Sequence, residues 1–158
     1  MKHFAAILLA AILSSCASSP EYLEGDVASD KLLNNVLFSQ PYSAYQVSKN
    51  ELDMLASLPD TLSISVFFGE WCGDSQREVP VVIKSFESKP AISLTLIALD
   101  MNKKEPKGRA AVGKVKFTPT MIIYNKGIEI GRIVERPKIN WISHITDIYR
   151  ADTNLSNP

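Results

Sequence analysis

The residue best suited to covalent chemistry is Cys72, which lies in the stretch Trp71-Cys72-Gly73-Asp74-Ser75. A buried strand is predicted before this stretch and a helix after it, so the cysteine falls at the start of a helix. Free amides and the dipole at a helix N-terminus stabilise an anion and lower the pKa of a thiol there. Ser75 follows one turn later, where its hydroxyl can donate to the sulfur. The pattern predicts a nucleophilic cysteine.

Charged residues near Cys72 act in opposite directions on its pKa. The carboxylate of Asp74 disfavours a thiolate, and the guanidinium of Arg77 can offset that effect. The sequence leaves open which effect dominates. Glu70, just before the stretch, is interpreted as a solvated loop residue.

Strands and helices alternate on both sides of this stretch. Apolar spacing and turn residues predict helices over residues 30–38, 48–58, 75–88, 109–115 and 139–149, and strands over residues 42–47, 62–68, 92–99, 119–124 and 128–134. The alternation indicates βαβ units and a parallel sheet, to which the terminal hairpin adds an antiparallel edge.

The stretch 71–75 resembles the Trp-Cys-Gly-x-Cys active site of thioredoxin-like proteins, with Ser75 in place of the second cysteine. Pro80 lies where thioredoxins carry the proline of the active-site helix. The segment 117–120, Phe-Thr-Pro-Thr, is similar to the one that holds the cis-proline of this family. Gly127 and Gly131 match the hairpin that follows.

The resemblance covers residues 40–150 and implies an α/β thioredoxin-like fold. The expected architecture is a central mixed sheet of four to five strands, with helices on both faces and a C-terminal β-hairpin. A cis bond before Pro119 would turn the backbone of Thr118 toward Cys72, where it could pair with an extended substrate. The resemblance thus implies a substrate-binding surface made of Trp71, Gly73, Asp74, Thr118 and Pro119.

The missing second cysteine changes the expected chemistry. In a dithiol thioredoxin the second cysteine resolves the mixed disulfide, which Ser75 cannot do. The buried Asp that assists this step in the family is replaced by Val66. The sequence therefore favours monothiol exchange by Cys72, as in isomerisation, deglutathionylation or mixed-disulfide capture. Two alternatives stay open: a peptide-binding module without redox turnover, and a thiol redox sensor.

Residues 1–15 have the pattern of a secretory signal. Lys2 is followed by an apolar run over residues 4–13, which is shorter than the roughly 20 residues that span a membrane. The sequence Leu-Ser-Ser before Cys16 resembles the bacterial lipoprotein box. This resemblance implies cleavage before Cys16 and lipid on that cysteine. Ala17 follows, which favours the outer membrane, facing the periplasm.

The predicted organisation has four parts. They are a cleaved signal peptide (1–15), a lipidated cysteine with a tether and an N-terminal helix (16–38), the thioredoxin-like domain (40–150) and a flexible tail (151–158). Ser, Pro, Gly and acidic residues over 17–30 suggest the tether.

Composition excludes several other classes of protein. The 158 residues include 17 Lys and Arg and 17 Asp and Glu, so the net charge is zero and no nucleic-acid surface is expected. Two cysteines rule out a disulfide scaffold and a zinc site made of cysteine pairs. No metal or cofactor is expected. The expected partners are protein or small-molecule thiols and disulfides, and a membrane through Cys16; the oligomeric state is open.

Overall fold

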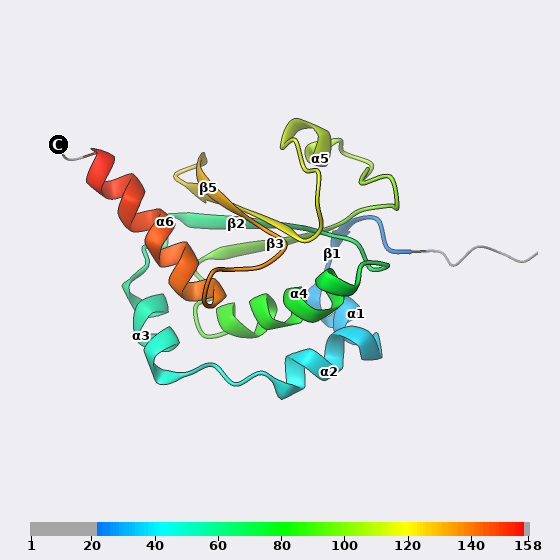
Figure 1. The fold of residues 1–158 in the computed structure, drawn as a ribbon, viewed down its shortest axis with the longest axis horizontal. Coiled ribbons are helices and arrows are strands. Elements are labelled where there is room, and N and C mark those ends of the chain that lie inside the picture. Colours follow the sequence, from blue (N-terminus) through cyan, green and yellow to red (C-terminus); the bar gives the residue numbers. More distant parts are fainter. Residues whose placement is uncertain (1–21, 157–158) are drawn as a thin grey trace, which may run out of the picture.

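A five-stranded mixed sheet forms the centre of the computed structural model, which describes residues 22–156 (Figure 1). The strands are β1 (Gly25–Val27), β2 (Leu62–Phe68), β3 (Ser93–Ala98), β4 (Thr120–Asn125) and β5 (Ile128–Val134). The helices are α1 (Ser29–Leu33), α2 (Val36–Ala44), α3 (Lys49–Ser57), α4 (Gly73–Phe86), α5 (Arg109–Val112) and α6 (Trp141–Ser156). The α/β class and the mixed sheet agree with the prediction.

The strand order is β1-β3-β2-β4-β5, and only the central pair β2 and β3 is parallel. β1 pairs with β3, β4 with β2, and β5 with β4, all antiparallel. The parallel pair is joined through α4, the crossover that a parallel connection requires. The loop between β2 and α4 therefore emerges at the carboxyl end of the central strand.

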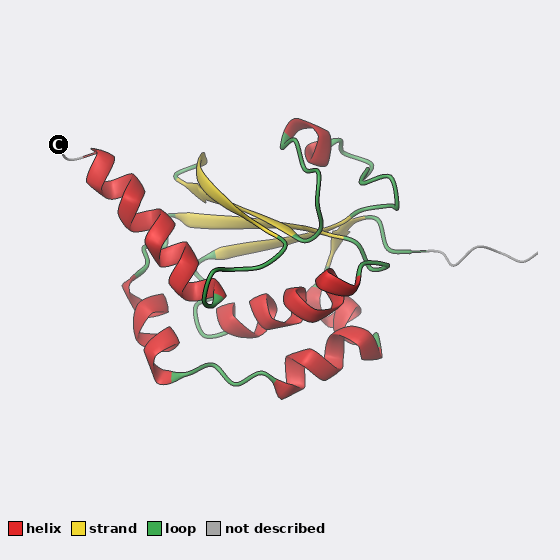
Figure 2. Cartoon of the chain, in the orientation of Figure 1, coloured by secondary structure: helices red, strands yellow, loops and turns green. Residues whose placement is uncertain are grey.

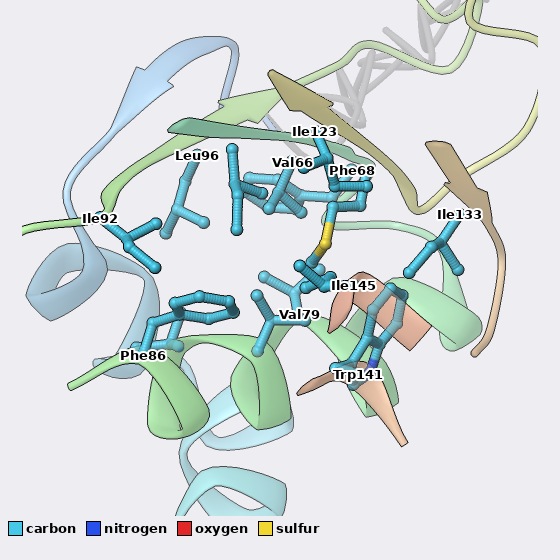
Figure 3. Packing of buried hydrophobic residues seen from close by; sticks show 14 of the residues in the cluster. Val66, Phe68, Val79, Phe86, Ile92, Leu96, Ile123, Ile133, Trp141 and Ile145 are labelled. Atoms are coloured by element: carbon cyan, nitrogen blue, oxygen red, sulfur yellow. The ribbon is translucent and has the colours of Figure 1, made fainter. Parts of the chain in front are cut away.

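The helices cover the two faces of the sheet unequally. α5 alone lies over one face, and the other helices lie on the opposite side (Figure 2). Alternate residues of β2 divide between two apolar clusters: Ile64, Val66 and Phe68 join the larger one and Phe67 the smaller. Figure 3 shows the larger cluster, where side chains of the sheet meet those of α4 and α6. Helices thus lie on both faces, as predicted, but the main core is on one side.

Local signals explain several elements. Ser48 accepts from the amide of Glu51, whose side chain accepts in return from the amide of Ser48, so the capping box predicted at the start of α3 is present. Gly127 has a φ of 81°, which suits the tight turn between β4 and β5. β2 and β5 have the predicted bounds.

The predicted strand over residues 42–47 is wrong. The first part of this segment continues α2, which runs through Pro41 to Ala44. Asn35 caps this helix by accepting from the amide of Leu37, 3.0 Å away. The predicted helix over 30–38 is accordingly two helices, which meet at Asn35.

Two segments predicted to be flexible are ordered where the structure describes them. Residues 25–27, within the predicted tether, form β1, because a three-residue strand can be added to an existing edge by backbone hydrogen bonds. The predicted tail 151–158 is helical up to Ser156, since α6 continues. Residues 1–21, which hold the predicted signal and Cys16, lie outside the described residues.

Within residues 22–156, no helix combines the length and the apolar character that crossing a bilayer requires.

Gly131 provides a test of how closely α6 packs on the sheet. A Cβ at this position would lie 2.7 Å from Cγ2 of Ile148. Gly131→Ala should therefore lower the free energy of unfolding by about 1–3 kcal/mol, as overpacking does. Urea denaturation measures the change.

A matched control is Gly73→Ala, because nothing lies within 4 Å of a Cβ built there. Adding Ile148→Ala to Gly131→Ala should make the two substitutions less than additive, since the crowded atoms are gone. Equal effects of the two glycine substitutions would contradict the close packing.

Candidate functional site

Cys72 is the N-cap residue of α4, directly after the loop that leaves β2. Its carbonyl accepts from the amide of Gln76 at 3.0 Å, and its amide donates to the carbonyl of Gly69 at 3.0 Å. These two bonds close a tight turn around the cysteine. The side chain is half-buried, and the sulfur lies at the positive end of a helix of 14 residues.

The segment before β4 lies against the sulfur. The Thr118–Pro119 peptide bond is cis, as predicted. The thiol of Cys72 donates to the carbonyl oxygen of Thr118, 3.2 Å away. The structure thus brings Cys72 together with Thr118 and Pro119, which lie 46 and 47 residues later in the chain.

Ser75 is fully buried beneath the thiol. Its Oγ accepts from the amide of Gly69, which is 3.2 Å away. Because the lone pairs of Oγ face this amide, the hydroxyl proton is available to the sulfur of Cys72. Ser75 therefore connects the end of β2 to the reactive atom.

The pKa of Cys72 lies below its ordinary value. Burial of the thiol would by itself raise the pKa, but hydrogen bonds from the side-chain hydroxyl of Thr118, from the backbone and hydroxyl of Ser75, and from the amide of Asp74 outweigh burial. Such bonds favour the charged form when the donor faces the sulfur. The site thus promotes the thiolate, which is the nucleophilic form.

Asp74 does not act as an isolated charge. Arg77 forms an ion pair with it, and the guanidinium of Arg136 lies 4.0 Å from the same carboxylate oxygen. These two cations counter the repulsion that Asp74 alone would exert on a thiolate. The pKa of Cys72 is lowered by hydrogen bonds from Thr118 and from the first turn of α4, even though the carboxylate of Asp74 lies in the same turn.

Trp71 is held in a fixed position beside the cysteine. Its Nε1 donates to the carbonyl of Leu99 at 3.0 Å, and the ammonium of Lys103 lies 5.8 Å from the ring centroid. A Cβ on Gly69 would be only 2.5 Å from the ring, so the indole lies directly on the backbone of that glycine. Sequence reasoning missed Leu99 and Lys103, because both follow β3 and come close only through the sheet.

The interpretation of Glu70 as a solvated residue is wrong. Its carboxylate accepts from the amide of Leu23 at 3.0 Å and from the side-chain amide of Asn35 at 2.9 Å. Its carbonyl accepts from the side chain of Gln76 at 2.8 Å. No local signal could reveal these bonds, since both partners of the carboxylate lie at least 35 residues away.

The remaining predicted residues lie as follows. Gly73 is the exposed first residue of α4, and Pro80 is buried inside the same helix. Val66 is 1% exposed and belongs to the main core, so that position offers no carboxylate to the sulfur. Within residues 22–156 Cys72 is the one cysteine, and no cluster of three or more His, Cys, Asp or Glu could hold a metal ion.

Comparisons with known proteins fit this geometry. The family model described as thioredoxin matches residues 21–146. A thioredoxin of Chlamydia pneumoniae is 31% identical over 68 residues, which are 43% of this chain and 63% of the relative. The chain thus spans less than two thirds of the length of that relative.

Two solved structures share the fold at low identity. A Pseudomonas aeruginosa protein of unknown function has a TM-score of 0.55 at 14% identity, over 80% of this chain and 99% of the other. An HIV epitope scaffold also has a TM-score of 0.55, at 16% identity, over 79% of this chain and 83% of the other. At these identities the likeness concerns the fold alone.

The lowered pKa of Cys72 predicts its reactivity. In the full chain carrying Cys16→Ser, alkylation of the one remaining thiol should rise with pH around a midpoint below about 8.5, the value of a free cysteine. Ser75→Ala should raise the midpoint by about one unit, because the thiolate loses one donor. The rate of iodoacetamide labelling against pH measures both.

Ser85→Ala is the matched control, since Ser85 is a buried serine of the same helix whose hydroxyl donates to Val81 instead. Its midpoint should equal that of the parent. A parent midpoint at or above about 8.5 would overturn the activated thiol.

Proposed function

The chain belongs to the thioredoxin family, and from this premise we propose that it carries out monothiol thiol–disulfide exchange with Cys72 as the nucleophile. The observation that carries the proposal is the environment of the sulfur. It lies at a helix N-terminus, receives hydrogen bonds that lower its pKa, and faces the backbone of Thr118. Ser75 occupies the place of a resolving cysteine and cannot form a disulfide.

The exchange balances without any oxidant or reductant held by the protein. The Cys72 thiolate attacks one sulfur of a substrate disulfide, a bond forms between the two sulfurs, and the substrate disulfide breaks. The second substrate sulfur leaves as a thiolate and takes a proton from solvent. A thiol of the same substrate, or an external small-molecule thiol, then attacks the mixed disulfide and releases Cys72.

The surroundings of the sulfur suit this cycle. Ser75 donates to the sulfur while it is an anion, both before attack and when it leaves again. Trp71 covers one side of the loop, and Thr118 offers backbone groups to an extended substrate. The partners are thiols and disulfides of proteins or small molecules.

We also propose that the protein is anchored to a bacterial membrane by lipid on Cys16. The apolar run and the Ser-Ser-Cys sequence before residue 17 support this, and Ala17 favours the outer membrane with the domain facing the periplasm.

The first test of the exchange is adduct formation with oxidised glutathione. Wild-type protein should gain the mass of one glutathione, and Cys72→Ala should gain none, because the attacking sulfur is gone. Intact-mass spectrometry measures the adduct. Ser85→Ala, which leaves the site untouched, should behave as wild type.

Ser75→Cys extends this test. It should allow an internal disulfide with Cys72 and give measurable reduction of insulin disulfides, which we expect wild type not to show. Partners that stay bound to Cys72→Ala with unchanged affinity, together with no glutathione adduct on wild type, would instead support a binding module.

The proposed lipid anchor predicts whether the protein enters the detergent phase or the aqueous phase of a detergent–water separation. Wild type produced in a bacterium should enter the detergent phase of a detergent–water separation and begin at a lipid-modified Cys16 by mass spectrometry. Cys16→Ser should stay in the aqueous phase. An unmodified Cys16 in a chain that still starts at Met1 would contradict the anchor.

A further inference from the structure

The described part of the chain begins at the end of the sheet where Cys72 also lies, beside the carboxyl ends of β2 and β3. Because β1 is antiparallel to β3, its first residue Gly25 lies opposite Ala98, the last residue of β3. Ala98 in turn pairs with Phe68, the last residue of β2, from which the Cys72 loop starts. If β1 were parallel to β3, the chain before β1 would instead lie at the amino ends of β2 and β3.

Glu70 fastens this entry to the active-site loop. One carboxylate oxygen accepts from the amide of Leu23 and the other from Asn35. Leu23 also packs against the main core. Glu70 lies two positions before Cys72 in the chain, and its side chain therefore holds Leu23 against the active-site loop.

The opposite end of the chain lies elsewhere. In Figure 1, the described chain begins on one side of the molecule, whereas α6 ends on the far side. A domain attached to a surface by its N-terminus would thus turn a different side toward that surface than a domain attached by its C-terminus.

We propose that Cys72 serves thiols and disulfides at the surface of the membrane to which the chain is attached, because the entry of the chain holds the active-site edge toward that surface. This rests on the proposed lipid at Cys16. Leu23 lies seven positions after Cys16, a length of chain that spans at most about 25 Å when extended. Because Leu23 is bonded to Glu70 in the Cys72 loop, this length of chain limits how far that loop can lie from the lipid attachment point.

The rim around the site suits a position beside lipid headgroups. Met101 is 66% exposed in the loop after β3, and Phe117 is 53% exposed directly before Thr118. Lys103 and Lys116 lie in the same two segments and can face anionic headgroups. Exposed apolar side chains accompanied by lysines are typical of surfaces that rest on a bilayer interface.

The test compares headgroup-bound and soluble thiol reagents. Lipidated protein that begins at Cys16 is placed in phosphatidylcholine vesicles that contain a small fraction of lipid with a maleimide headgroup. Capture of Cys72 by this lipid should fall about sevenfold when about 20 Gly and Ser residues are inserted between Ser19 and Pro20, because effective concentration falls with roughly the three-halves power of tether length. Labelling by soluble N-ethylmaleimide should not change.

A matched control attaches the domain by its other end. Full-length Cys16→Ser with a histidine tag after Pro158, bound to nickel-chelating vesicles, should react with the maleimide lipid more slowly than the wild type does. Equal capture by wild type and the insertion variant, with equal soluble labelling, would overturn the membrane-facing orientation.

The outcomes also separate this inference from the proposed function. A wild-type protein that does not associate with vesicles would show that the lipid anchor fails, and the inference with it. A Cys72 that resists the soluble reagent would contradict the activated thiol instead.

Discussion

The buried hydrogen bond from the Gly69 amide to the Ser75 hydroxyl is the contact on which the rest of the site depends. This bond joins the loop directly after β2 to the first turn of α4. Without it, the buried amide of Gly69 would lack an acceptor and the buried hydroxyl of Ser75 would lack a donor. With this junction fixed, Cys72 can lie only at the N-cap of α4. The indole of Trp71 then fits over Gly69, where any side chain would collide with it.

The same junction shapes the chemistry of the sulfur. Ser75 is small enough to be buried, accepts from one side and donates to the other, and so stabilises a thiolate. It also removes the second sulfur that a dithiol cycle needs. Ser75 thus contributes to the lowered pKa of Cys72 and at the same time cannot form a disulfide with it, so the proposed exchange needs a thiol from outside the domain to complete its cycle.

The layers of the molecule explain why the site is open to partners. Most helices pack on one face of the sheet, and the short α5 alone lies over the other. Loops surround the carboxyl ends of β2 and β3. Among them are the Cys72 loop, the segment with Lys103 and the segment with Thr118. The antiparallel β1 brings the entry of the chain to this same end of the sheet.

The sequence alone determined most of the local structure. The apolar run of β2, the capping box of α3 and the turn at Gly127 are short-range patterns, in which neighbouring residues supply both the donors and the acceptors. The position of Cys72 at a helix start followed from the strand and helix patterns around it, whereas the cis-proline before β4 followed from the family resemblance. The sequence also sufficed to exclude an internal disulfide between Cys72 and Ser75.

Only the tertiary structure decided the features that depend on distant partners. β1 exists because β3 offers an edge some 70 residues later, and Glu70 is a structural residue because Leu23 and Asn35 reach it. Arg136 comes within 4.0 Å of Asp74 only in the folded chain, and no spacing rule connects the two residues. Each of these contacts gains its energy from groups that the fold brings together, so no pattern along the chain could encode it.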